Sequence, residues 1–125
     1  METRSLDDVL AAARAKLDRI APESFDSAVA AGAVVIDVRD SALRDRQGSL
    51  AGAHVIDLTI LEWRVAPSSR SRTIEVLDGQ QVILVCSEGF SSSLAAARLQ
   101  ALGVRHATDL IGGFTALTAY REAQT

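Results

Sequence analysis

The chain has 125 residues, 48% of them hydrophobic and 23% charged, which is the composition of one globular domain large enough to bury a core without disulfides or a structural metal. Its 13 basic and 16 acidic residues give a net charge of −3. This charge provides no general attraction to phosphate backbones or anionic lipid, so we expect neither nucleic acid nor a membrane as a partner.

A helix is predicted at the N-terminus. Apolar residues recur at helical spacing over residues 6–20, and Ser5 stands three residues before Asp8, as in a capping box. Ala21-Pro22 is expected to end this helix. We interpret residues 1–22 as a helical extension and 23–125 as the main domain. The helix has two alternative places, on the core of its own domain or on that of a second subunit in a homodimer.

The rest of the chain alternates between strand and helix patterns. A short helix is predicted over residues 25–31, ended by Gly32. Short apolar or β-branched runs predict strands at 34–38, 54–58, 82–85 and 107–111. Residues 39–52 read as a surface connection with at most a short helix, 59–65 as helical, 66–73 as a loop, and 92–102 and 114–122 as helices. This order predicts an α/β fold, a parallel sheet with helices on both faces.

Few residues suit metal binding or membrane targeting. Cys86 is the only cysteine, and together with His54 and His106 it does not form a convincing zinc set, so no metal or other cofactor is expected. The first twenty residues contain acidic side chains and no apolar run long enough for a signal peptide or membrane span. We therefore expect a cytoplasmic protein with a free thiol.

Cys86 stands between a predicted strand and a predicted helix. In parallel sheets ligands bind at the carboxyl ends of strands, which is where Cys86 falls. Backbone N–H groups of a short loop and the positive end of a helix starting near Ser92 favour a thiolate, the nucleophilic form of cysteine. Gly89 suits a tight curl of that loop. Many lone cysteines are simply small buried hydrophobes, but the order of strand, loop and helix favours a nucleophile here.

Four segments resemble, in order, the motifs of single-domain rhodaneses over about residues 23–121. Val34–Arg39 is similar to the apolar-IDVR motif, Gly48–Ala53 to GHIPGA, Cys86 to the start of the active-site loop, and Gly112-Gly113-Phe114 to the closing GGF. The resemblance implies a rhodanese-like fold and a sulfurtransferase that needs no cofactor. Its Cys86 persulfide would carry sulfane sulfur from thiosulfate or a persulfide, including a protein persulfide, to a thiol or cyanide. The alternative is a non-catalytic rhodanese-like module that binds a protein partner or regulates it.

The loop departs from the pattern of thiosulfate-using rhodaneses, many of which carry a cation at the position of Ser91. Here neither Ser91 nor Ser92 is basic, and Glu88 is acidic. At about 6 Å and an effective dielectric near 20, one charge changes the thiolate energy by about 3 kcal/mol, so we expect thiosulfate to be a poor donor. Phosphatase chemistry is disfavoured because Ser92 stands where an oxyanion-clamping arginine would be required.

The predicted site combines the nucleophile, its loop and one distant cation. Arg64, beside Trp63, is the expected ligand for substrate oxyanions because a guanidinium can fork onto sulfonate-like groups. The predicted catalytic residue is Cys86, and the predicted substrate-binding residues are Ser87, Glu88, Gly89, Phe90, Ser91, Ser92 and Arg64.

Overall fold

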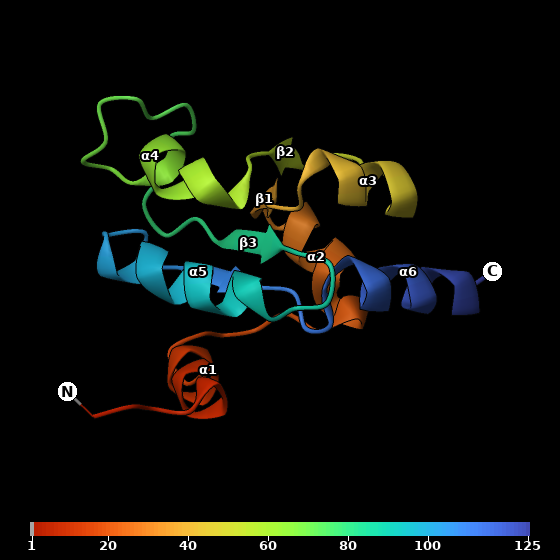
Figure 1. Cartoon of the computed structure of the whole chain (residues 1–125). Helices are drawn as coiled ribbons and strands as arrows, with labels where there is room; N and C mark the ends of the chain where they lie inside the picture. The colour runs from red at the N-terminus through yellow and green to blue at the C-terminus, as the bar shows by residue number, and fades with distance from the viewer. Residues whose placement is uncertain (1) are drawn as a thin grey trace.

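The computed structural model describes residues 2–125 as a four-stranded sheet with helices on both faces (Figure 1). The strands β1 (Val34–Asp37), β2 (His54–Val55), β3 (Val82–Val85) and β4 (Ala107–Asp109) lie in the order β2-β1-β3-β4. All three strand pairings are parallel. The predicted α/β class is therefore confirmed.

Six α-helices and two 3₁₀ turns connect and cover the strands within the described residues. They are α1 (Leu6–Arg14), η1 (Pro22–Ser24), α2 (Phe25–Ala30), α3 (Ser41–Gln47), η2 (Leu58–Ile60), α4 (Leu61–Val65), α5 (Ser91–Ala101) and α6 (Gly113–Ala123). No helix within residues 2–125 combines the length and the apolar character that a membrane span requires.

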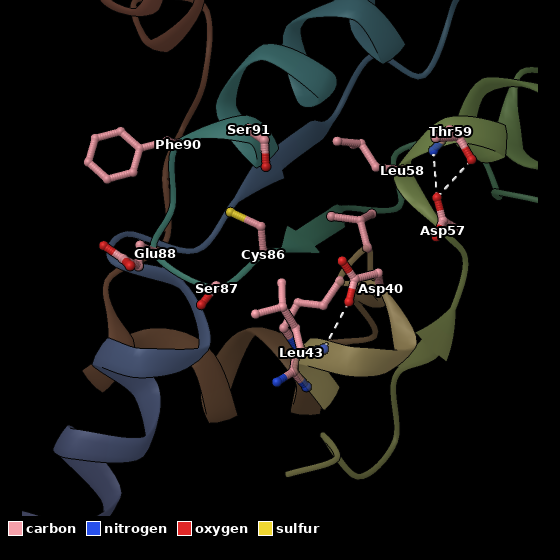
Figure 2. Close-up of a pocket in the computed structure, with 12 residues that line it drawn as sticks. Asp40, Leu43, Asp57, Leu58, Thr59, Cys86, Ser87, Glu88, Phe90 and Ser91 are labelled. Atoms are coloured by element: carbon pink, nitrogen blue, oxygen red, sulfur yellow. Dashed lines mark hydrogen bonds between the residues drawn. The ribbon is translucent and has the colours of Figure 1, made fainter. Parts of the chain in front are cut away.

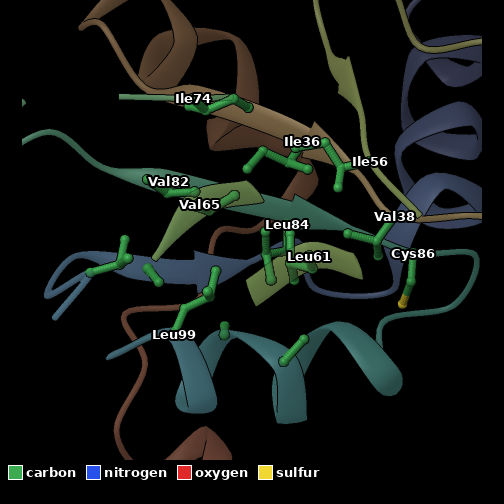
Figure 3. Packing of buried hydrophobic residues seen from close by; sticks show 14 residues of the cluster. Ile36, Val38, Ile56, Leu61, Val65, Ile74, Val82, Leu84, Cys86 and Leu99 are labelled. Atoms are coloured by element: carbon green, nitrogen blue, oxygen red, sulfur yellow. The ribbon is translucent and has the colours of Figure 1, made fainter. Parts of the chain in front are cut away.

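Two apolar layers pack on opposite faces of the sheet because successive side chains of a strand alternate between faces. On one face Val82 and Leu84 of β3 pack with residues of α4 and α5, including Leu61 and Leu99 (Figure 3). On the other face Ile83 and Val85 pack with residues of α2 and α6. Cys86 continues the first set, so its side chain lies on the α5 side of the sheet.

The first helix begins as predicted but ends earlier. Ser5 caps α1, its hydroxyl accepting from the Asp8 N–H at 3.1 Å. The predicted end near residue 20 is wrong, because α1 stops at Arg14 and the chain then runs to the sheet edge. There the Ile20 N–H donates to Asp109 O, and Ile20 O accepts from the Ile111 N–H, which pairs backbone groups at the outer edge of β4.

The helix α1 packs against α5 of its own chain, below it in Figure 1. Of its residues Ala13 is buried, and farther along the chain Leu17 contacts the apolar layer on the α5 side of the sheet. The segment before residue 21 thus lies directly beside the helix that follows Cys86.

Two strands differ from their predicted extent, and the connection after β1 holds a short helix within the predicted bounds. The strand predicted at 54–58 ends at Val55, and Asp57 then caps η2 by accepting from the Thr59 N–H. The connection after β1 contains a helix of seven residues, α3, because Asp40 caps it by accepting from the Leu43 N–H. The last strand ends at Asp109 because the chain turns at Leu110, whose carbonyl accepts from the Gly113 N–H.

Candidate active site

Cys86 is the first residue after β3 and lies at the wall of a pocket of about 600 Å³ (Figure 2). Its side chain is buried. The pocket is lined by residues following β1, β2 and β3, namely Val38, Arg39, Asp40, Leu43, Asp57, Leu58, Thr59, Cys86, Ser87, Glu88, Phe90 and Ser91. The carboxyl ends of neighbouring parallel strands thus converge on one thiol, as the sheet topology predicts.

Polar groups of the loop and of α5 surround the sulfur. The Gly89 N–H donates to Cys86 Sγ at 3.1 Å, and Sγ lies 3.1 Å from Ser92 Oγ. Burial raises the pKa of the thiol and is the largest single influence on it. Hydrogen bonding with the Ser92 side chain and N–H, the Ser91 side chain and the Gly89 N–H together outweighs it, so the pKa of Cys86 is below its ordinary value.

The turn between β4 and α6 holds the start of this loop. The Phe114 N–H donates to Cys86 O at 2.9 Å, and the Thr115 N–H donates to Ser87 O at 3.0 Å. Gly113 has a φ of +64°, and a Cβ at this position would lie 2.5 Å from Cys86 O. The second glycine of the turn is therefore required both by its left-handed backbone and by the close approach of the loop.

A buried carboxylate lies behind the serines of α5. Asp109 Oδ2 accepts from Ser92 Oγ and from Ser93 Oγ, each at 2.7 Å, and Asp109 Oδ1 accepts from Arg19 Nε at 2.8 Å. Sequence reasoning missed this group. An aspartate inside the predicted strand 107–111 was the available signal, whereas nothing local marks Arg19.

The structure brings most of the predicted site together. Five of the predicted residues line the pocket, namely Cys86, Ser87, Glu88, Phe90 and Ser91. Gly89 and Ser92 contact the sulfur without lining the pocket. Arg64 is not brought to the pocket, since its guanidinium donates to Ser71 O in the loop after α4. No cluster of three or more potential metal ligands occurs within residues 2–125.

Comparison with known protein families gives a match over most of the chain. The rhodanese-like domain family matches residues 21–120. The chain belongs to this family. The match begins just before η1 and covers every strand, whereas α1 and Arg19 precede it.

Solved structures show the same rhodanese-like fold. A Rhodopseudomonas palustris protein of unknown function, named a possible tyrosine phosphatase, is 23% identical with a TM-score of 0.84, over 97% of this chain and 94% of its own. A Thermus thermophilus rhodanese homologue is 27% identical, with a TM-score of 0.60, over 79% of this chain and 99% of its own. A human single-domain sulfurtransferase is 19% identical, with a TM-score of 0.67, over 81% and 95%. Among curated proteins none matches.

The charged side chains that line the pocket of this rhodanese-like domain are mainly acidic. Asp40, Asp57 and Glu88 carry carboxylates, and the hydrogen bonds from Thr59 lower the pKa of Asp57. The one lining guanidinium belongs to Arg39, which is buried and donates to both carboxylate oxygens of Asp37. Asp37 therefore already neutralises the charge of Arg39, before any substrate binds.

The lowered pKa of the thiol predicts the pH dependence of its reactivity. A group with a lowered pKa loses its proton at lower pH, so the rate of Cys86 alkylation by iodoacetamide should rise through a midpoint below that of a free thiol measured under the same conditions. Quenched samples taken across a pH series and measured by mass spectrometry give this midpoint, with glutathione as the reference thiol. A midpoint equal to or above that of glutathione would contradict the prediction.

Proposed function

We propose that this rhodanese-like domain is a sulfurtransferase that carries sulfane sulfur as a persulfide on Cys86. The observation that supports this most directly is the buried Cys86 sulfur at a pocket wall, accepting from the Gly89 N–H, with Ser92 Oγ beside it. The Gly89 N–H favours an anionic sulfur, and a persulfide is also an anion at neutral pH. We place the reaction in a reducing compartment such as the cytoplasm, where a free thiol persists.

The proposed reaction has two displacement steps and no net redox change. In the first, the Cys86 thiolate attacks the outer sulfur of the donor, a new S–S bond forms, and the donor's own S–S bond breaks. The electron pair leaves with sulfite when the donor is thiosulfate, or with a thiolate when it is a persulfide. In the second, an acceptor thiolate or cyanide attacks the outer sulfur and the Cys86 thiolate leaves.

The charges around the pocket favour a persulfide over thiosulfate as donor. Thiosulfate is a dianion, and at the pocket it meets the carboxylates of Asp40, Asp57 and Glu88 with no unpaired guanidinium on the lining. A low-molecular-weight or protein persulfide carries less charge at the reacting end. The acidic lining therefore penalises thiosulfate more strongly than a persulfide.

Tyrosine phosphatase chemistry, named as possible for the R. palustris protein, fits this site poorly. Such chemistry needs a guanidinium that forks onto the phosphate oxygens. The required position holds Ser92, whose side chain is buried and donates to Asp109. An arginine there would have to displace both the Ser92–Asp109 hydrogen bond and the contact with the Cys86 sulfur.

Intact-mass measurements with two donors test the proposed function. After incubation with a low-molecular-weight persulfide, the protein should gain the mass of one sulfur atom, and cyanide should remove it as thiocyanate. Thiosulfate should give less of this product at equal concentration. If neither donor adds a cyanide-labile sulfur, the enzyme proposal is wrong and the domain is better explained as a binding module.

Placing an arginine at position 91 should improve the use of thiosulfate. Ser91 is exposed at the start of α5 and lines the pocket, so in Ser91→Arg the guanidinium is within reach of a sulfonate group. We expect kcat/KM for thiosulfate to rise about tenfold, the effect of roughly 1.4 kcal/mol of added binding. Thiocyanate formation measures this rate.

Ser91→Gln is the matched control, because it adds length without charge. Its kcat/KM for thiosulfate should stay near that of the original protein. If a folded Ser91→Arg protein gains no more than Ser91→Gln, the missing loop cation does not limit thiosulfate use.

A further inference from the structure

Two arginines from the segment before residue 21 contact the Cys86 loop at the carbonyl oxygen of Gly89, which we call the back of the loop because the Gly89 N–H faces the sulfur. Arg14, the last residue of α1, donates from Nη2 to Gly89 O at 2.7 Å. Arg19 donates from Nη2 to the same oxygen at 3.2 Å. Both residues precede the region matched by the rhodanese-like family. The contacts therefore connect the active-site loop to a part of the chain outside that match.

Gly89 is held at both of its backbone polar groups. Its N–H donates to the Cys86 sulfur, and its carbonyl oxygen accepts from Arg14 and Arg19. A glycine has more backbone freedom than any other residue, so its orientation depends on such partners. With the carbonyl fixed from behind, the N–H stays directed at the sulfur.

Arg19 also compensates a buried negative charge close to the sulfur. Asp109 is fully buried, and only Ser92 separates its carboxylate from Cys86 Sγ in the chain of hydrogen bonds. A carboxylate at this place opposes a thiolate electrostatically. Arg19 donates to both oxygens of Asp109, and Arg14 donates from Nε to Ser93 Oγ, which itself lies beside Asp109.

We propose that Arg14 and Arg19 are positioning residues that supply, from behind the loop, the positive charge that the loop itself lacks. Arg19 cancels the charge of Asp109, and Arg14 with Arg19 orients Gly89, so that an anionic Cys86 sulfur is favoured although the loop carries no cation. The interpretation of this anion as a sulfur carrier rests on the proposed function. The effect on the thiolate itself does not, and it is measured without any sulfur donor.

The other charged groups near the sulfur do not take this role. Glu88 on the loop and Asp40 and Asp57 across the pocket are negative and oppose a thiolate. Arg39 is positive, but it pairs with Asp37. Arg14 and Arg19 are therefore the cations in contact with the loop that remain to balance Asp109.

The decisive experiment removes the charge of each partner of the Arg19–Asp109 ion pair in turn. The pH profile of Cys86 alkylation is measured for Arg19→Gln and for Asp109→Asn. Arg19→Gln removes the direct ion-pair partner of Asp109 and should raise the midpoint, slowing alkylation at neutral pH about tenfold. Asp109→Asn leaves the arginines uncompensated and should lower the midpoint. Arg14→Gln should raise it by less than Arg19→Gln does.

This opposition of sign separates an electrostatic and positioning role from a merely structural one. If the ion pair only held the fold together, breaking it from either side would loosen the loop and move both midpoints toward that of a free thiol. Arg19→Lys keeps the charge and should restore most of the alkylation rate lost in Arg19→Gln. Arg105→Gln, which breaks an exposed ion pair with Asp78, is the control and should leave the midpoint unchanged.

Folding of the variants is followed by circular dichroism. If Arg19→Gln does not fold, the comparison of Asp109→Asn with the original protein and with a double variant decides the result. The double variant Arg19→Gln with Asp109→Asn removes both charges and should return the midpoint toward that of the original protein. A midpoint in Asp109→Asn that is raised or unchanged would overturn the proposal. Loss of sulfur transfer with the predicted midpoints would instead contradict only the proposed function.

Discussion

Replacing Cys86 by serine is expected to abolish sulfur loading and to lower thiocyanate formation by at least about a thousandfold, because a serine hydroxyl is not ionised at neutral pH and is a weak nucleophile. The substitution is conservative in shape. The Gly89 N–H that donates to sulfur and the Ser92 hydroxyl beside it are both suitable partners for a serine oxygen. We therefore expect the fold to survive and the chemistry to be lost.

The single cysteine makes this test unambiguous. Because no second thiol exists in the chain, any cyanide-labile sulfur found on the Cys86→Ser protein would have to be carried elsewhere. Intact mass before and after cyanide treatment measures this directly, with thermal unfolding as the check on the fold. A variant that still loads one sulfur would refute the assignment of Cys86 as the carrier.

The parts of the site predicted correctly from the sequence are those set by neighbours along the chain. β3 is an unbroken apolar run, and α5 follows it after a short loop, so the placement of Cys86 at a strand end needed no long-range information. The fold class followed from the alternation of strands and helices. Both follow from periodicity and order.

The parts missed from the sequence depend on contacts between distant segments. A helix to residue 20 is favoured by local spacing, but pairing of Ile20 with the outer edge of β4 prevails over that preference. That pairing brings Arg19 to Asp109, ninety residues later in the chain. Arg64 was expected near the substrate for its chemistry alone, and the tertiary structure directs it to Ser71 instead.

These contacts change the electrostatic interpretation of the loop. From its own residues the loop is uncharged apart from Glu88, so backbone N–H groups are the only evident support for a thiolate. In the structure, two guanidinium groups lie on the outer side of Gly89. The positive charge of these guanidinium groups supports an anionic sulfur, while the residues that line the pocket remain mainly acidic. This combination favours a donor that is less charged than thiosulfate.

The second large effect is expected from Gly113→Ala, which should destabilise the protein by about 3 kcal/mol or more and lower sulfur transfer at least tenfold. Gly113 has a left-handed backbone, where a Cβ is strained. In addition, the new Cβ would lie 2.5 Å from Cys86 O and 2.7 Å from the Ser87 carbonyl carbon and oxygen. The loop start must shift, which weakens the bonds that the N–H groups of α6 donate to it.

Gly79→Ala separates the steric effect from the backbone strain. Gly79 has a φ of +79°, and a Cβ there would meet no atom within 4 Å, so this variant carries the strain without the contact with the loop. We expect it to lose about 1 kcal/mol of stability and to retain its sulfur transfer rate. Urea unfolding gives both free energies, and the rate of cyanide-dependent turnover is measured well below the unfolding transition. Equal losses in the two variants would show that backbone strain alone, and not the approach of Gly113 to the Cys86 loop, explains the need for glycine.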